Sequence, residues 1–293
     1  MQEGIILKGI AGFYYVKVKD GRTIECKARG KFRNCNLTPV IGDRVFIEEI
    51  DNNSGVIKEI MDRKNLLIRP YVANIDQAIV VFAAKKPHIV FSLLDKLLIQ
   101  IEHNNIEAVI CINKSDLDDS QIIEKVKSIY EKVGYKVITT NALTGEGIDK
   151  LKEILRGKVS VFAGPSGVGK STLFNKIQNK VKMETQDVSE RISRGRHTTR
   201  HAEIIDIDYD TYVVDTPGFS SLDLDFIKAD ELQYAFKEFK DYIGKCKFTS
   251  CMHYKETDCI IKQAVKEGII PFERYNTYIE ILQELQSSRR MKR

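Results

Sequence analysis

The sequence lacks any apolar run near the roughly 18 residues that a membrane-spanning helix needs. Its first residues, MQEGIILKGIAG, begin acidic and lack the basic region of a secretory signal. The net charge of +5 is modest, so neither sign of charge dominates. This charge does not by itself demand a nucleic-acid partner. These absences argue against a membrane or secreted protein, and we expect a cytoplasmic one.

The 293 residues exceed one comfortable hydrophobic core, so two or three domains are expected. An apolar share of 43% and a charged share of 30% are those of an ordinary globular protein. Turn signals and periodicity then divide the chain into segments 1–68, 72–222 and 223–293.

Segment 1–68 reads as five short strands separated by turns such as Lys19-Asp20-Gly21. Five strands in so short a segment predict a small closed barrel of the oligonucleotide-binding (OB) type, with an SH3-like barrel as the alternative. Basic residues dominate from Lys17 to Arg33, with Phe13, Tyr14, Tyr15 and Phe32 among or beside them. This mixture fits RNA binding by stacking and phosphate contact, although a solvated basic face with barrel-filling aromatics is also compatible.

Segment 72–222 alternates continuous apolar runs with amphipathic stretches, which predicts an α/β domain with a parallel sheet. The stretch GPSGVGKS (164–171) follows the apolar run KVSVFA and precedes STLFNKIQ, which reads as a helix. This is the setting of a phosphate-binding loop. Lys170 would reach the β and γ phosphates and the Ser171 hydroxyl would bind Mg²⁺. The predicted phosphate-binding residues are Gly164, Pro165, Ser166, Gly167, Val168, Gly169, Lys170, Ser171 and Thr172.

The stretch DTPG ends the apolar run YVV about 45 residues downstream, a spacing typical of a second phosphate-sensing element. Asp215 is the predicted Mg²⁺ partner, and the Gly218 N–H is expected to meet the γ phosphate. Between the two motifs lies RISRGRHTTRHAEI, expected to be a switch loop that orders when triphosphate binds. Thr198 and Thr199 are both candidates to complete the Mg²⁺ shell, with Thr199 preferred.

The tetrapeptide NKSD follows the apolar run EAVICI and predicts a guanine-reading loop. Asp116 can accept hydrogen bonds from guanine N1 and N2, Asn113 can bind the base edge or brace the loop, and the stem of Lys114 can cover the base. Ser115 belongs to the same predicted GTP-binding set. NALTGEG follows the next strand, and there the Ala142 N–H is the expected guanine contact.

The order of these motifs is unusual, because the base-reading loops precede the phosphate loop. Joining the end of the DTPG half to the start of the NKSD half restores the conventional order of a GTPase. Relocated chain ends are tolerated in surface loops of compact domains. We therefore predict a circularly permuted GTPase domain.

Segment 223–293 reads as a small helical module around three cysteines and one histidine: Cys246, Cys251, His253 and Cys259. In a reducing compartment such a cluster favours metal over disulfides. Three thiolates and an imidazole complete a tetrahedral structural zinc site and leave no position for water.

Taken together, the motifs NKSD, GPSGVGKST, GRHTT and DTPGF, with the barrel and the Cys/His cluster, resemble the RsgA (YjeQ/YloQ) family of circularly permuted GTPases. The resemblance covers essentially the whole chain. It implies GTP hydrolysis to GDP and phosphate, stimulated by the small (30S) ribosomal subunit, during late subunit maturation. It also implies flanking modules that bind ribosomal RNA, structural zinc, and Mg²⁺ with GTP. A monomer is the default expectation.

Phe219 follows DTPG where Ras-like enzymes carry a water-orienting glutamine. His197 is the candidate replacement, since an imidazole can orient water, although it can also serve to position the loop or contact RNA. With Lys170 and Thr199 it completes the predicted catalytic set. A GTP-dependent RNA-binding factor without turnover and a signalling GTPase are the alternatives. Because DTPGF leads directly into the metal module, we also predict that its movement reorients that module.

Overall fold

A computed structural model gives the fold of residues 1–30, 32, 37–68, 70–119, 121–178, 203–208, 210–219, 224 and 226–291. The chain divides into two compact units. The first comprises Met1–Ile79, Ile148–Ala163 and Lys170–Phe219, and the second comprises Val80–Gly147, Gly164–Gly169 and Ser220–Arg293. Among the described helices, none is both long and apolar enough to cross a membrane.

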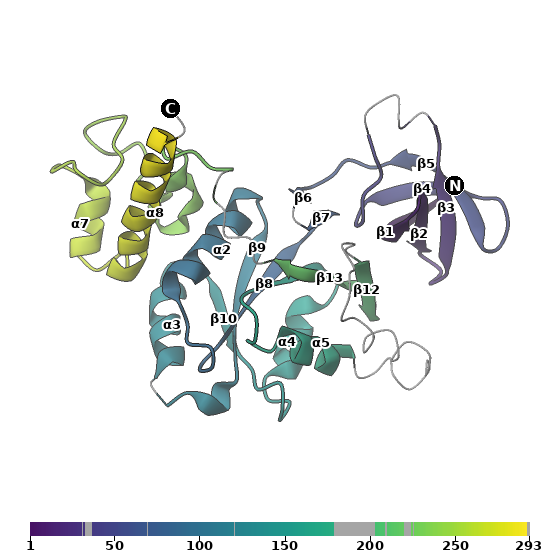
Figure 1. The fold of residues 1–293 in the computed structure, drawn as a ribbon, viewed down its shortest axis with the longest axis horizontal. Coiled ribbons are helices and arrows are strands. Elements are labelled where there is room, and N and C mark those ends of the chain that lie inside the picture. The colour runs from purple at the N-terminus through teal and green to yellow at the C-terminus, as the bar shows by residue number, and fades with distance from the viewer. Residues whose placement is uncertain are drawn as a thin grey trace. The chain divides into compact units, whose positions relative to one another are not determined.

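The N-terminal segment forms a closed barrel in the order β1-β2-β3-β5-β4 (Figure 1). Its alternating residues pack inward on a core that includes Ile6, Val16, Val45 and Ile57. The ring closes through a parallel β3–β5 pair and an antiparallel β1–β4 pair, which is the OB arrangement and not the SH3-like alternative. The strands are β1 (Gln2–Ile10), β2 (Phe13–Val18), β3 (Thr23–Ala28), β4 (Arg44–Glu49) and β5 (Ser54–Ile60).

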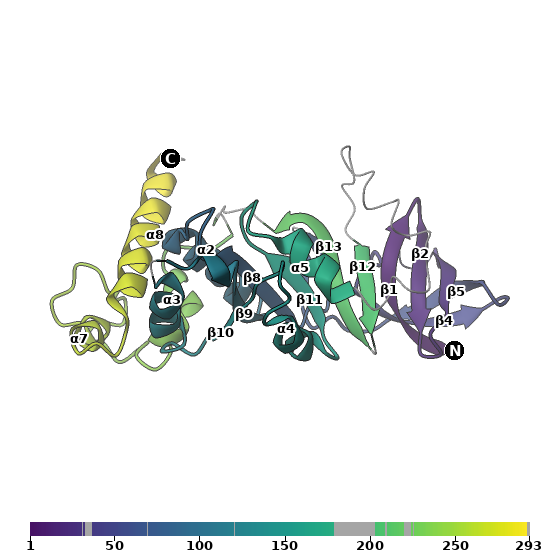
Figure 2. The same cartoon turned by 90° about the horizontal axis from the view of Figure 1, so that it is seen from below.

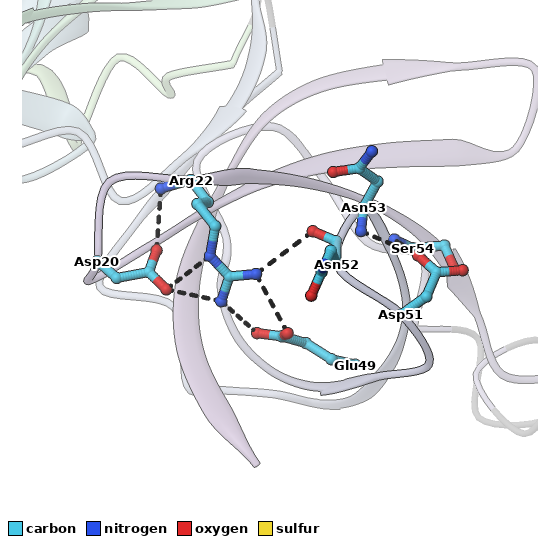
Figure 3. Close-up of polar contacts among 7 residues, drawn as sticks. All are labelled: Asp20, Arg22, Glu49, Asp51, Asn52, Asn53 and Ser54. Atoms are coloured by element: carbon cyan, nitrogen blue, oxygen red, sulfur yellow. Dashed lines mark hydrogen bonds and ion pairs between the residues drawn. The ribbon is translucent and has the colours of Figure 1, made fainter.

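Arg22 ties together two turns at one end of this barrel (Figure 3). Its guanidinium donates to Asp20, to Glu49 at 2.9 Å and to the Asn52 carbonyl oxygen at 3.3 Å. Lys19 forms an ion pair with Glu3 of β1. Part of the basic run from Lys17 to Arg33 is thus engaged within the chain, and its Lys31 and Arg33 lie outside the described residues.

A short hairpin follows the barrel, and the sequence did not predict it. It consists of β6 (Leu66–Ile68) and β7 (Tyr71–Ala73). Gly42 takes φ +87° against it, and a Cβ there would lie 2.1 Å from the Ala73 carbonyl oxygen. Only glycine permits this close approach between the barrel and the hairpin.

Six strands form the central sheet in the order β10-β9-β8-β11-β13-β12. The β9–β10 and β11–β13 pairs are parallel, as predicted, whereas β12 is an antiparallel edge strand because a tight turn joins it to β13. Reading β11, β12, β13 and then β8, β9, β10 restores the order phosphate loop, DTPG, NKSD. The chain enters this sheet at β8, so the domain is circularly permuted.

The apolar runs EAVICI, KVSVFA and YVV form strands, as predicted. Its strands are β8 (Gln77–Ala83), β9 (Glu107–Asn113), β10 (Lys136–Thr139), β11 (Val159–Ala163), β12 (Glu203–Asp208) and β13 (Thr211–Phe219). Its helices are α2 (Phe91–His103), η1 (Ser115–Leu117), α3 (Ile122–Tyr130), α4 (Ile148–Leu155) and α5 (Lys170–Ile177). The apolar faces of α2 and α3 pack on β9 and β10 respectively.

The C-terminal module is helical, as predicted, and packs around Phe236, Phe239 and Tyr278. Ile99 of α2 belongs to the same buried cluster, so this core is continuous with the second unit's part of the sheet domain. The module contains η3 (Leu232–Ala235), η4 (Lys237–Phe239), α7 (Ile260–Lys266) and α8 (Phe272–Met291), drawn in green to yellow in Figure 1.

Candidate nucleotide and metal sites

Asn113 connects three loops at the end of β9. Its side chain is buried, and Nδ2 donates to the Val168 carbonyl oxygen of the phosphate loop at 2.9 Å. Its Oδ1 accepts from the Thr140 hydroxyl and from the Ala142 N–H, each at 3.1 Å. Asn113 therefore braces the two predicted base-reading loops against the predicted phosphate loop, which is one of the two roles that the sequence left open.

Lys114 adds a second link between these loops. It takes a left-handed backbone conformation (φ +58°), and its ammonium donates to the carbonyl oxygens of Gly167 at 2.8 Å and Lys86 at 2.5 Å. The Ser115 hydroxyl is buried without a hydrogen-bond partner in the described part of the chain, and Asp116 is exposed on η1. The exposed carboxylate of Asp116 is accessible to a base, as the guanine-reading hypothesis requires.

The Lys86 contact identifies a turn that sequence reasoning missed. Residues 85–87 follow β8, and Lys85 forms an ion pair with Asp119 beside the base-reading loop. Pro87 lies 3.9 Å from where a Cβ on Gly167 would stand. The sequence did contain a signal for this turn, because KKP, like NKSD, follows an apolar strand. Loops that follow parallel strands gather at one edge of the sheet.

The NALTGEG loop is shaped by its own asparagine. Asn141 Oδ1 accepts from the N–H groups of Leu143 at 3.0 Å and Thr144 at 3.3 Å, which closes a local turn. The buried Ala142 N–H donates to Asn113, so guanine recognition by this N–H requires sharing or exchanging that bond.

The phosphate loop joins β11 to α5 through backbone that requires glycine. Gly164 takes φ +133°, and a Cβ there would lie 2.1 Å from the Val81 carbonyl oxygen. Gly169 takes φ +97°, and a Cβ there would meet Asn113 Nδ2 at 2.3 Å.

The other residues of the loop differ in burial. Burial lowers the pKa of Lys170. Val168 is buried, Pro165 is half-buried, and the exposed members are Ser166, Gly167, Ser171 and Thr172.

The predicted switch residues are only partly described. His197, Thr198 and Thr199 lie outside the described residues. Asp215 and Gly218 lie in β13, where the Asp215 backbone pairs with Glu203, but the side chain of Asp215 lies outside the described part. Their proposed roles rest on the motif alone.

The four predicted metal ligands come together in the C-terminal module. The three sulfur atoms and one imidazole nitrogen of Cys246, Cys251, His253 and Cys259 lie within 4.8 Å of one another. Tetrahedral zinc with Zn–S bonds of about 2.3 Å separates its sulfur ligands by about 3.8 Å. The 4.0 Å between the Cys246 and Cys259 sulfurs fits that arrangement, so the cluster can hold a metal ion.

The surroundings of the cluster also suit a metal. His253 directs Nδ1 at the Cys259 and Cys246 sulfurs, at 3.4 and 3.6 Å, while Nε2 lies 2.8 Å from the Gln233 side-chain oxygen. This partner holds the ring with Nδ1 facing the thiols, as metal-binding histidines require. Burial raises the pKa of Cys251 to about 12, so a cation is needed to hold its thiolate.

The permuted sheet with its glycine-shaped phosphate loop and braced NKSD loop defines a circularly permuted P-loop GTPase. Residues 60–225 match the family described as RsgA GTPase, and residues 3–57 match the RsgA N-terminal domain. The chain belongs to the RsgA GTPase family.

Individual relatives agree over nearly full length. The small ribosomal subunit biogenesis GTPase RsgA of Caldanaerobacter subterraneus subsp. tengcongensis is 49% identical, over 97% of this chain and 95% of that protein. The crystal structure of YjeQ from Thermotoga maritima is 40% identical with a TM-score of 0.85, covering 97% of this chain and 98% of the other. YloQ, whose structure is described as a circularly permuted GTPase, is 35% identical with a TM-score of 0.85, over 98% and 96% of the two chains.

Proposed function

We propose that this protein is a small-ribosomal-subunit biogenesis GTPase, which hydrolyses GTP to time its release from the maturing subunit. The names of relatives about half identical over nearly the whole chain support this function. The same comparisons favour an enzyme over a factor that holds GTP without turnover or a signalling GTPase.

The observation that carries the proposal is the bracing by Asn113. In the sequence, NKSD precedes the phosphate loop by about 50 residues, yet Asn113 and Lys114 hydrogen-bond to Val168 and Gly167. These contacts support a single site in which the NKSD loop reads guanine and residues 164–172 cradle the phosphates. We assign guanine to Asp116 and the Ala142 N–H, with the Lys114 stem over the base, and the phosphates to residues 164–172.

Mg²⁺ would supply positive charge to the β and γ phosphates. We propose Ser171, Thr199 and Asp215 as its ligands; the exposure of Ser171 at the start of α5 suits this role. Lys170 would balance γ-phosphate charge, the Gly218 N–H would bind the γ phosphate, and His197 would orient the attacking water in place of glutamine.

Zinc is the proposed occupant of the Cys/His cluster, and its role is structural because four protein ligands leave no open position. Ribosomal RNA is the proposed partner of the barrel and the metal module. We further propose domain limits of 1–68, 72–222 and 223–293, a monomer, and a cytoplasmic location.

GTP turnover measured with and without purified small ribosomal subunits tests this proposal. We expect the subunits to accelerate turnover, and His197→Ala to reduce it by about 10²–10⁴-fold, the range of general acid–base contributions. GTP affinity, measured in parallel, should stay nearly unchanged. Equal turnover with and without subunits contradicts the proposed function, whereas unchanged stimulated turnover in His197→Ala removes only that residue from the mechanism.

A further inference from the structure

An acidic edge strand of the sheet lies against a basic part of the barrel, within the first unit (Figure 2). Strand β12 has the sequence EIIDID and runs beside β1. The Lys8 ammonium lies 3.2 Å from the Glu203 carboxylate, and the Lys17 ammonium forms an ion pair with Asp206. The lysines that a nucleic-acid-binding barrel would present to phosphates thus contact carboxylates of β12.

Tyr212 of β13 extends this contact. The Lys17 ammonium lies 5.8 Å from the centre of the Tyr212 ring, a cation–π distance. Burial raises the pKa of Tyr212 to about 12, with a further contribution from the Asp206 charge, while Arg44 of the barrel acts in the opposite direction. Lys17 and Arg44 are therefore two cations of the barrel that lie close to the part of the sheet that carries Asp206.

The ion pairs are of a kind that a polyanion can displace. The side chains of Lys17 and Asp206 are 19% and 33% exposed, and those of Lys8 and Glu203 are 34% and 47% exposed. The Lys8–Glu203 pair is the more accessible to water of the two, and such a pair contributes little net stability. In addition, one carboxylate oxygen of Asp206 is buried without a hydrogen-bond partner in the described part of the chain, so its desolvation is incompletely compensated.

We propose that Glu203 and Asp206 occupy Lys8 and Lys17 in the free protein, and that the phosphate backbone of an RNA takes these lysines when it binds. Docking of the barrel on β12 and binding of RNA at these lysines are then mutually exclusive. The partner class rests on the proposed function. RNA is favoured over an acidic protein because Phe13 and Tyr15 lie on the same strand as Lys17, and Lys27 of the neighbouring β3 lies 5.0 Å from the Phe13 ring.

The backbone register gives this exchange a route to the nucleotide site. Glu203, which holds Lys8, is the β-ladder partner of Asp215 in the DTPG motif. When RNA takes Lys8, Glu203 loses its ion pair with the barrel. Strand β12 would then be released from the barrel while it stays hydrogen-bonded to β13, which carries the second phosphate-sensing element.

The experiment compares polyuridylate affinity of the full chain and its variants across a range of salt concentrations. Neutralising the acids with Glu203→Gln or Asp206→Asn should tighten binding about two- to fivefold, the range expected for removing one partly exposed competing pair. Lys17→Gln should weaken binding and lower the salt dependence by roughly one phosphate contact. On the Lys17→Gln background, Asp206→Asn should give no gain.

Asp208→Asn is the matched control, since it removes the same charge from the same strand at a residue that lines a pocket beside α4. The inference is overturned by an equal gain in the Asp208 variant, by a gain that persists without Lys17, or by no gain in either test variant. Competition by poly-glutamate as effective as that by RNA assigns the lysines to acidic protein instead. Subunit-stimulated GTP turnover of the unsubstituted chain tests the proposed function separately, because it requires no comparison between variants.

Discussion

The two modules that flank the nucleotide-binding sheet are stabilised by different means. The barrel is a closed ring in which each strand hydrogen-bonds to two neighbours around a core of aliphatic side chains. The C-terminal module has no strand among its described residues, 224 and 226–291, and its helices, of which only α8 is long, surround a few aromatic rings. A segment with so little regular backbone pairing needs other sources of stability.

Two such sources are present in the module. One is the Cys/His cluster, and the other is Arg274 of α8, whose side chain is fully buried. Its guanidinium donates to Asp95 of α2 and to Glu238 of η4, both at 2.6 Å, and Tyr130 donates to the same Asp95 oxygen. The module is therefore anchored to the helix that packs on β9. If movement of DTPGF reorients the module, as connectivity predicts, α2 must move with it or this network must break.

Removing a metal ligand should have the largest effect and separate the two modules most clearly. We expect Cys259→Ser to abolish binding of the proposed zinc ion and the folded state of the module, because structural zinc contributes on the order of 10 kcal/mol in small zinc domains. The barrel should stay folded. Elemental analysis measures bound zinc, and hydrogen exchange measures whether α7, α8 and β1–β5 stay folded. Full protection of α7 without metal would contradict a structural role for the site.

Removing Arg274 should have the next largest effect. Arg274→Ala leaves Asp95 and Glu238 buried without their partner, and breaking a buried pair costs about 3–5 kcal/mol. We expect α8 and α2 to lose exchange protection together, while β1–β5 stay unchanged. Loss of protection in α8 alone would show that the network does not join the two helices.

Sequence reasoning succeeded where a local pattern determines the structure. The phosphate loop needs glycine at positions 164 and 169, and these residues are visible in the motif. It failed where partners are distant, since Asp95 and Arg274 are 179 residues apart and each looks like an ordinary charged residue on a helix. The pairing of Lys17 with Asp206 was missed for the same reason, because a basic run reads as free charge until the fold places carboxylates beside it.

Within the barrel, Asp43 offers a smaller test of the comparison. It is buried and accepts hydrogen bonds from the Val40 N–H at 2.7 Å and from two Arg63 nitrogens at 2.7 and 2.8 Å. Asp43→Asn replaces one acceptor with a donor facing Arg63, and we expect a loss of about 1–3 kcal/mol. Chemical denaturation monitored by exchange of β1–β5 measures it. A loss as large as that in Arg274→Ala would mean that the barrel depends on buried charge as much as the module does.

The smallest effect is expected at Lys96, one residue from Asp95 on α2. Lys96 pairs with Glu284 of α8 at 2.8 Å, so it joins the same two helices as Arg274, but the Glu284 side chain is 58% exposed. Lys96→Met keeps the apolar stem and removes the charge, and we expect a loss below about 1 kcal/mol. The exchange protection of α8 is measured in Lys96→Met and in Arg274→Ala, and the two losses are compared. Equal losses in the two variants would show that the contact between these helices depends on charge pairing irrespective of burial; a small loss at Lys96 assigns the anchoring to the buried network.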